Sequence, residues 1–113
     1  MTLERFNAAV DEQLELCRNL LIGKGKEYAP KSDRENQGDR LEHFKKAAAL
    51  TGGNQKKALL GMFSKHIISI CDMCSDSTGY TVDKWNEKIT DSINYLLILK
   101  AMVTEEADMN GQN

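Results

Sequence analysis

The sequence predicts an all-α fold, a four-helix, bundle-like arrangement with one short helix and a long loop after the first helix. Apolar residues return at three- and four-residue steps in four segments, which is the period of an α-helix. The 113 residues include one proline and 6% aromatic residues, which fits helices better than a sandwich of short strands. The length suits one domain. We expect this all-α domain to span 1–104 and a frayed tail to span 105–113.

The first predicted helix is Leu3 to Ile22. Thr2 is placed to cap its start, and Gly23 is placed to end it. Its apolar residues recur along one face, which we expect to lie in the core: Leu3, Phe6, Val10, Leu14, Cys17, Leu20 and Leu21. On its flank Glu12 and Glu15 lie about one turn apart, so their carboxylates could hold one hard cation together. The alternative is an ordinary solvated helix face.

A loop is predicted from Gly23 to Gly38, because this stretch contains the proline and three of the eight glycines. Connections longer than about a dozen residues are uncommon in a compact domain and are often functional. Tyr28 could stack on a nucleotide base while Lys24 and Lys26 contact phosphates. A surface loop without a ligand remains the alternative.

Two helices are predicted in the middle of the chain. The first is short, from Asp39 to Leu50, and is ended by Gly52. Asn54 can cap the second, which runs to about Ser75. Its predicted core stripe consists of Leu59, Met62, Phe63, Ile67, Ile70 and Cys74. We expect the two cysteines of its CxxC to face the core as well, since no second pair completes a zinc site.

The other side of this second helix carries Gly61 and Lys65 in one row. A glycine inside a helix costs about 1 kcal/mol relative to alanine, and it often marks the close approach of a backbone or a ligand. Lys65 is a candidate partner for the carboxylate of Asp91. The two could form a partly buried ion pair, or Lys65 could bind a phosphate.

The last predicted helix runs from Val82 to Val103, with Thr81 as its cap. We expect its apolar face in the core, formed by Val82, Trp85, Ile89, Ile93, Leu96, Met102 and Val103. A second row carries acids and a tyrosine at four-residue steps: Asp83, Glu87, Asp91 and Tyr95. Asp91 is thus predicted at the edge of a buried surface, where a charge needs a cation, a metal or strong hydrogen-bond donors.

Composition limits the partners. The net charge is −2 and the pI is near 5.7, which gives no electrostatic reason for binding duplex nucleic acid or anionic membranes. The longest aliphatic run, Leu96 to Leu99, is too short to cross a bilayer. Three cysteines make an odd number, which favours reduced thiols over a disulfide framework. These features predict a cytoplasmic protein.

Four stretches of the sequence resemble a known family. They read K-x-x-x-Y from Lys24, D-R-x-x-x-F-K-K-A-A from Asp39, L-L-G-M-F-S-K-H-I-x-S-I from Leu59 and W-x-E-K-I-x-D-S-I-N-Y-L-L-I-L from Trp85. Over about 24–103 the chain resembles small phage and prophage proteins related to the all-α MazG-like nucleoside triphosphate pyrophosphohydrolases. Host cytoplasm is the location that this resemblance implies for a phage-encoded protein. The matching positions in the phage group are Tyr28, Phe44, Lys65, Asp91, Asn94 and Tyr95.

The resemblance also implies a chemistry. MazG-like enzymes hold magnesium with helical carboxylates of ExxE and ExxD type, and the metal bridges the triphosphate and activates water. Glu12 and Glu15 match the first pair, whereas Glu87 and Asp91 approximate the second as ExxxD. The implied metal ligands are Glu12, Glu15, Glu87 and Asp91. The implied catalytic residues are Asp91, Glu87 and Lys65, and the implied substrate contacts are Tyr28, Lys24, Lys26, Lys65, Asn94 and Tyr95.

The leading hypothesis is therefore a magnesium-dependent nucleoside triphosphate pyrophosphohydrolase-like protein that forms homo-oligomers. One alternative is a phage protein that sequesters a nucleotide or inhibits a host protein without catalysis. Another is an oligomeric structural module, since a unit this small leaves apolar surface to cover. Convergence of the four carboxylates favours the enzyme, and one acid paired with Lys65 favours the binding protein. Exposure of Trp85 or Ile98 favours a subunit interface.

Overall fold

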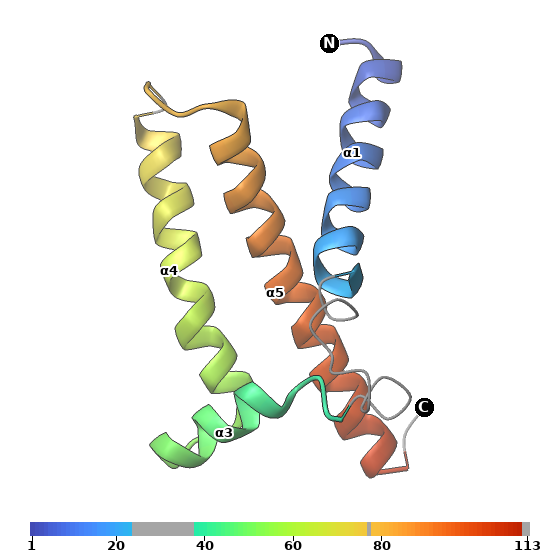
Figure 1. Cartoon of the computed structure of the whole chain (residues 1–113), viewed down its shortest axis with the longest axis vertical. Helices are drawn as coiled ribbons and strands as arrows, with labels where there is room; N and C mark the ends of the chain where they lie inside the picture. The colour runs from blue at the N-terminus through green and yellow to red at the C-terminus, as the bar shows by residue number, and fades with distance from the viewer. Residues whose placement is uncertain (24–37, 77, 112–113) are drawn as a thin grey trace.

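The computed structural model describes residues 1–23, 38–76 and 78–111 (Figure 1). Four α-helices make up most of it. They are α1 (Leu3–Arg18), α3 (Glu42–Thr51), α4 (Gln55–Ser75) and α5 (Val82–Met109), and a π-helical turn, Asn19–Gly23, continues α1. The all-α class is confirmed, because 83% of the described residues are helical and none of them lies in a strand. None of the described helices combines the length and the apolar character that crossing a bilayer requires.

The predicted starts of three helices are confirmed by their caps. The side chains of Thr2, Asn54 and Thr81 each accept a hydrogen bond from the backbone N–H three residues later, at 3.0, 3.0 and 3.1 Å. Each bond satisfies one of the N–H groups that a helix start leaves without a partner. The short helix α3 begins three residues later than Asp39, whose carboxylate accepts the N–H of Leu41 at 2.9 Å instead.

The helices are arranged around α5 (Figure 1). It runs antiparallel to α4, and α1 packs on α5 from the other side. The short α3 packs on α4 and crosses the end of the molecule where α4 begins. Gly52 ends α3 in the left-handed conformation, with φ of 73°, which glycine adopts without steric cost.

The core lies where α3, α4 and α5 meet. Its buried residues are Leu41, Phe44, Leu59 and Met102. Half-buried residues of α4 and α5 pack around them: Met62, Phe63, Tyr95, Ile98 and Leu99. The core is therefore at one end of the molecule, and α1 contributes no residue to this cluster.

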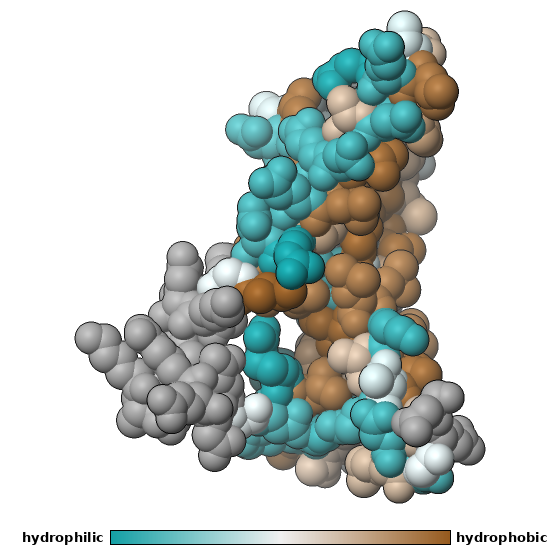
Figure 2. All heavy atoms as spheres, turned by 90° about the vertical axis from the view of Figure 1, so that its right-hand side faces the viewer, coloured by the Kyte–Doolittle hydropathy of each residue, from teal (hydrophilic) through white to brown (hydrophobic). Residues whose placement is uncertain are grey.

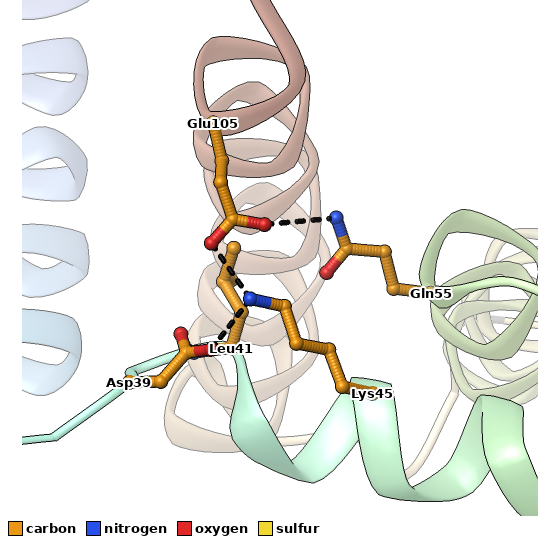
Figure 3. Close-up of polar contacts among 5 residues, drawn as sticks. All are labelled: Asp39, Leu41, Lys45, Gln55 and Glu105. Atoms are coloured by element: carbon orange, nitrogen blue, oxygen red, sulfur yellow. Dashed lines mark hydrogen bonds and ion pairs between the residues drawn. The ribbon is translucent and has the colours of Figure 1, made fainter. Parts of the chain in front are cut away.

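A polar cluster holds the three helices together at this end (Figure 3). The ammonium of Lys45 donates to the carboxylates of Asp39 and Glu105, the latter at 2.7 Å. The side-chain amide of Gln55 donates to the other oxygen of Glu105 at 3.4 Å. These contacts explain why α5 continues to Met109, whereas the sequence predicted a frayed end over 105–113.

The apolar face of α1 is a first correction to the predicted core. Leu3, Phe6, Val10 and Leu14 are 74, 56, 43 and 57% exposed, and only Cys17 of this face is fully buried. The reason is that α5 is the α-helix against which α1 packs, and this packing leaves most of the face open. Amphipathic pattern alone did not reveal that the described chain leaves this face open.

The apolar face of α5 is a second correction. Val82, Leu96 and Val103 are 73, 51 and 48% exposed, whereas Met102 is fully buried. Met102 lies on the side of α5 that packs against Leu59 and Phe44, so it does not share a face with the other three. The predicted single stripe is therefore two stripes, of which one forms the core.

The cysteines of α4 are a third correction. Cys71 and Cys74 are free and exposed, and Met73 is buried in place of Cys74. Ile67, also expected in the core, is 40% exposed. The first part of the predicted stripe, Leu59, Met62 and Phe63, does pack in the core, and beyond it the inward side of α4 passes through His66 and Met73.

Candidate functional site

A cavity of about 320 Å³ lies between the last turns of α1 and the first half of α5. Leu16 of α1 and Leu20 of the π-helical turn that follows form one wall. Five polar residues of α5 form the rest of its lining: Asp83, Asn86, Glu87, Thr90 and Asp91. We call this cavity the acidic hollow. Its volume is at the lower end of the range for small-molecule sites, and its mixture of an apolar wall and a few polar groups is typical of them.

The acids of the hollow come from one row of α5. Asp83, Glu87 and Asp91 follow one another at four-residue steps, so helix geometry stacks them along one side. The sequence predicted this row, and the structure places all three acids in one cavity. In the described chain the cations near the row are Lys84, 3.7 Å from Glu87, and His66, 3.9 Å from Asp91. The hollow therefore has a net negative charge while His66 is neutral.

The neighbour of Asp91 is His66, and this corrects the predicted pairing with Lys65. The 3.9 Å separation between Nδ1 of His66 and Oδ2 of Asp91 is too long for a hydrogen bond. Nδ1 is buried and has no hydrogen-bond partner among the described residues. Lys65 misses Asp91 because adjacent residues of a helix point about 100° apart, and α4 directs His66 toward α5.

Lys65 lies in a different cavity, of about 600 Å³, between α3 and α4. Lys57, Gly61 and the Gly52–Gly53 turn also line this α3–α4 hollow. A Cβ built on Gly61 would meet nothing within 4 Å, so no described part of the chain approaches this glycine closely. The α3–α4 hollow is basic and separate from the acidic hollow, and the structure does not bring Lys65 together with Glu87 and Asp91.

Tyr95 continues the acidic row toward the core. Its ring lies 5.0 Å from the ring of His66 and 5.7 Å from that of Phe63, measured between centroids. Burial raises the pKa of the Tyr95 hydroxyl, and the negative charge of Asp91 raises this pKa further. The phenol therefore stays neutral at physiological pH and can donate a hydrogen bond.

Three buried polar side chains lie along α5, namely Thr90, Ser92 and Asn94. Thr90 accepts a hydrogen bond from the side-chain amide of Gln13 at 2.7 Å, which links α1 to α5. Ser92 donates to the carbonyl of Lys88 at 2.8 Å. In contrast, Oδ1 of Asn94 is buried without a donor in the described part of the chain. An unpaired buried acceptor costs about 1–3 kcal/mol, so Asn94 lowers the stability of the fold.

Sequence reasoning missed Gln13, Thr90 and His66 as parts of this region. Thr90 had a signal, because it precedes Asn94 by one turn and so lies on the same side of α5. His66 had a weaker one, since a histidine at the edge of an apolar stripe is usually packed. Gln13 had none, because its role depends on which side of α1 meets α5.

The other predicted metal ligands do not join Glu87 and Asp91. Glu12 lines a neighbouring cavity of about 420 Å³, and Glu15 is exposed on α1. Within the described ranges no group of three or more His, Cys, Asp or Glu side chains is close enough to hold a metal ion. The convergence of four carboxylates that would favour the enzyme is therefore not found there.

Some predicted residues are not tested by these contacts. Tyr28, Lys24 and Lys26 lie outside the described residues, and their role stays a prediction.

Trp85 and Ile98 are half-buried, so neither is the exposed residue that was expected to indicate a subunit interface. Trp85 packs edge-on against Tyr80, with ring centroids 6.2 Å apart.

Comparisons of the chain with protein-family models, with curated proteins and with solved structures find no match. The function of the acidic hollow is therefore inferred from its own residues.

Proposed function

We propose that the chain binds a nucleoside triphosphate with magnesium in the acidic hollow and hydrolyses it between the α and β phosphates. The observation that carries this proposal is the row of Asp83, Glu87 and Asp91 along one cavity. Carboxylate oxygens are the hard ligands that Mg²⁺ prefers. The same acids repel a bare triphosphate, so binding requires the cation. The resemblance to MazG-like pyrophosphohydrolases supports the choice of reaction.

The donor set fits a magnesium ion that arrives with its nucleotide. In such sites Mg²⁺ keeps several waters and takes one or two carboxylates together with substrate phosphates. Glu87 and Asp91, one turn apart on α5, supply two carboxylates, and Asp83 extends the row by another turn. When bound, the metal neutralises charge on the phosphates and supplies an activated water.

The residues of the chain have separate roles in this proposal. Glu87 and Asp91 bind the metal complex and accept hydrogen bonds from its waters. Leu16 and Leu20 offer an apolar wall against which the flat face of a base can pack. Asn94 is buried and does not line the hollow. Glu12, Glu15 and Lys65 have no direct part.

A second candidate is a binding protein without catalysis. The observation that favours it is the lack of a third carboxylate close enough to complete a metal cluster in the described ranges. Hydrolysis of a triphosphate needs a positioned water as well as charge neutralisation, and sequestration needs only the second. The same hollow and the same residues serve in both cases, so turnover distinguishes them.

The test is calorimetric titration of a nucleoside triphosphate panel with and without Mg²⁺, followed by assay of the mixtures for pyrophosphate. Magnesium-dependent binding with turnover supports the hydrolase. Binding without turnover supports the sequestering protein, and no binding in any mixture refutes the nucleotide proposal. Asp91→Asn is expected to weaken binding more than about tenfold. Asp108→Asn, an exposed acid later on α5, is the matched control and should bind as the unmodified chain does.

Lys65→Ala locates the ligand. Lys65 lines the α3–α4 hollow, so the variant should bind the nucleotide normally if the acidic hollow is the site. A strong loss of nucleotide affinity in Lys65→Ala, together with normal binding by Asp91→Asn, would place the site in the α3–α4 hollow and refute its assignment to the acidic hollow.

A further inference from the structure

Apolar residues of α1 and α5 follow a seven-residue step. On α5 the row is Val82, Ile89, Leu96 and Val103, of which Ile89 is half-buried, and on α1 it begins with Leu3 and Val10. A seven-residue apolar repeat is the pattern of helices that pack against other helices. Within the described chain no helix covers these rows, since Leu3, Val82 and Leu96 are 74, 73 and 51% exposed.

The two rows form one continuous surface. Phe6 and Val10 of α1 line the same cavity as Val82 and Ile89 of α5, so the rows meet there. Figure 2 shows apolar residues gathered in a band along one side of the molecule. We call this surface the apolar face. It consists of Leu3, Phe6, Val10 and Leu14 on α1 and Val82, Ile89, Leu96 and Val103 on α5.

The apolar face leaves large side chains open on both helices. Leu3, Phe6, Val10 and Leu14 of α1 are 74, 56, 43 and 57% exposed, and Val82, Leu96 and Val103 of α5 are 73, 51 and 48% exposed. Contiguous exposed apolar patches on a folded chain mark interaction surfaces. A stable dimer buries about 800 Å² on each partner.

We infer that the apolar face is the interface of a two-fold symmetric dimer of this chain. In such a dimer the same patch packs on itself, and two sets of heptad rows provide helix-to-helix packing across the axis. A net charge of −2 per chain opposes this association only weakly. A second copy of the chain is present wherever the first is, so covering the apolar face in this way requires no other kind of molecule.

The dimer does not depend on the proposed nucleotide function. At about 100° per residue, the row of Val82, Ile89 and Leu96 and the row of acids lie on nearly opposite sides of α5. Leu16 and Asn86 line both the acidic hollow and the cavity where the rows meet, but the three acids themselves lie away from the apolar face. A failure of nucleotide binding and a failure of dimerisation are separate results, because each is measured without the other.

The first test is sedimentation of the unmodified chain from about 1 to 100 µM, a range in which a dimer of micromolar affinity forms. We expect a species of twice 12.7 kDa to dominate at the upper end. A monomer at every concentration would overturn the inference. Open-ended larger assemblies would overturn the two-fold symmetry, because an isologous contact closes on itself.

The second test is a matched pair of leucine variants. Leu96→Asp places a charge in the apolar face and should give a monomer with the helical circular dichroism of the unmodified chain. Leu50→Asp changes a leucine that is 89% exposed on α3, away from this face, and should remain dimeric. Leu14→Asp probes the α1 side, in case Leu96→Asp does not fold. Folded, dimeric Leu96→Asp or Leu14→Asp would overturn the assignment of the face.

Discussion

The pKa of Tyr95 depends on the charge of Asp91. Its pKa is raised first by burial and then by the Asp91 carboxylate. Asp91→Asn removes the second cause, so we expect the Tyr95 pKa to fall while staying above that of an exposed tyrosine. Ultraviolet titration of the unmodified chain and Asp91→Asn measures this, and Tyr95→Phe identifies the signal. An unchanged Tyr95 pKa in Asp91→Asn would show that the two side chains do not interact.

The same raised pKa has a consequence for stability. The folded state holds the Tyr95 proton more tightly than the unfolded state does. Its contribution is thus fully present below the unfolded pKa of about 10 and is lost as the pH rises through the folded pKa. In Tyr95→Phe the decrease in the free energy of unfolding at alkaline pH should lack the part that comes from Tyr95.

Asn94 is expected to lower the stability of the chain. Its buried oxygen has no donor in the described chain, so Asn94→Leu should raise the free energy of unfolding by about 1 kcal/mol. Denaturant unfolding measures this effect. Ser92→Ala is the control, because the Ser92 hydroxyl already bonds to a carbonyl of its own helix. Lower stability of Asn94→Leu would contradict this account of Asn94.

At the residue scale the sequence predicts on which side of a helix a side chain lies better than it predicts which residue that side chain contacts. Four-residue spacing placed Asp83, Glu87 and Asp91 on one side of α5, since that spacing is a property of the helix itself. The partner of Asp91 depends on how α4 is rotated about its own axis. That rotation brings His66 to Asp91 in place of Lys65, and it is decided by packing that spacing does not encode.

Lys45 links the start of α3 to the end of α5. Its hydrogen bond lowers the pKa of the Asp39 carboxyl, with a further contribution from the N–H of Leu41. In Lys45→Met we expect the Asp39 pKa to rise toward its usual range, as measured by carboxyl-carbon NMR titration. Because the Asp39 pKa is depressed in the folded state, the stability that the pair adds is present above about pH 4 and is lost as the pH falls.

The neighbouring lysine provides the control for this titration. Among the described residues Lys46 pairs only with Glu42, one turn earlier on the surface of α3, at 3.2 Å. Lys46→Met should leave the Asp39 pKa unchanged. Equal Asp39 pKa values in the unmodified chain and Lys45→Met would contradict the role given to Lys45.

At the element scale, helix starts are predictable and helix ends are less so. Thr2, Asn54 and Thr81 cap their helices through bonds to residues three positions away, which the local sequence reveals. The end of α5 depends on distant partners. Glu105 and Glu106 pair with Lys45 and with Lys56 at 2.7 and 2.9 Å, and no local pattern shows that these lysines are near.

At the scale of the whole molecule, the apolar pattern shows which faces need cover and not which chain covers them. The faces of α1 and α5 were predicted to pack in the core of one chain. The face of α1 is largely exposed, and the face of α5 is exposed at Val82, Leu96 and Val103 but buried at Met102. The core that does form joins α3, α4 and α5. A periodic pattern is the same for packing within a chain and between chains, so sequence alone could not separate these cases.

A dimer makes thermal stability depend on protein concentration. Because dissociation accompanies unfolding, the midpoint Tm of the unmodified chain should rise as its concentration increases. Leu96→Asp should melt lower and at a midpoint that does not change with concentration. Differential scanning fluorimetry over a hundredfold concentration range, about 1 to 100 µM, makes the comparison. A concentration-independent Tm for the unmodified chain would argue that its apolar face stays uncovered.

The measurement that most directly tests the proposed site is NMR of the ¹⁵N-labelled chain with a nucleoside triphosphate and Mn²⁺ in place of Mg²⁺. Both ions favour oxygen ligands, and paramagnetic Mn²⁺ broadens the signals of nearby amides. The proposal predicts broadening centred on Asp83–Asp91 and on Leu16 and Leu20, with sharp signals for Gly52 and Gly53 in the α3–α4 hollow. Broadening centred on the α3–α4 hollow would contradict the proposal. So would a spectrum in which adding the nucleotide causes no broadening beyond that of Mn²⁺ alone.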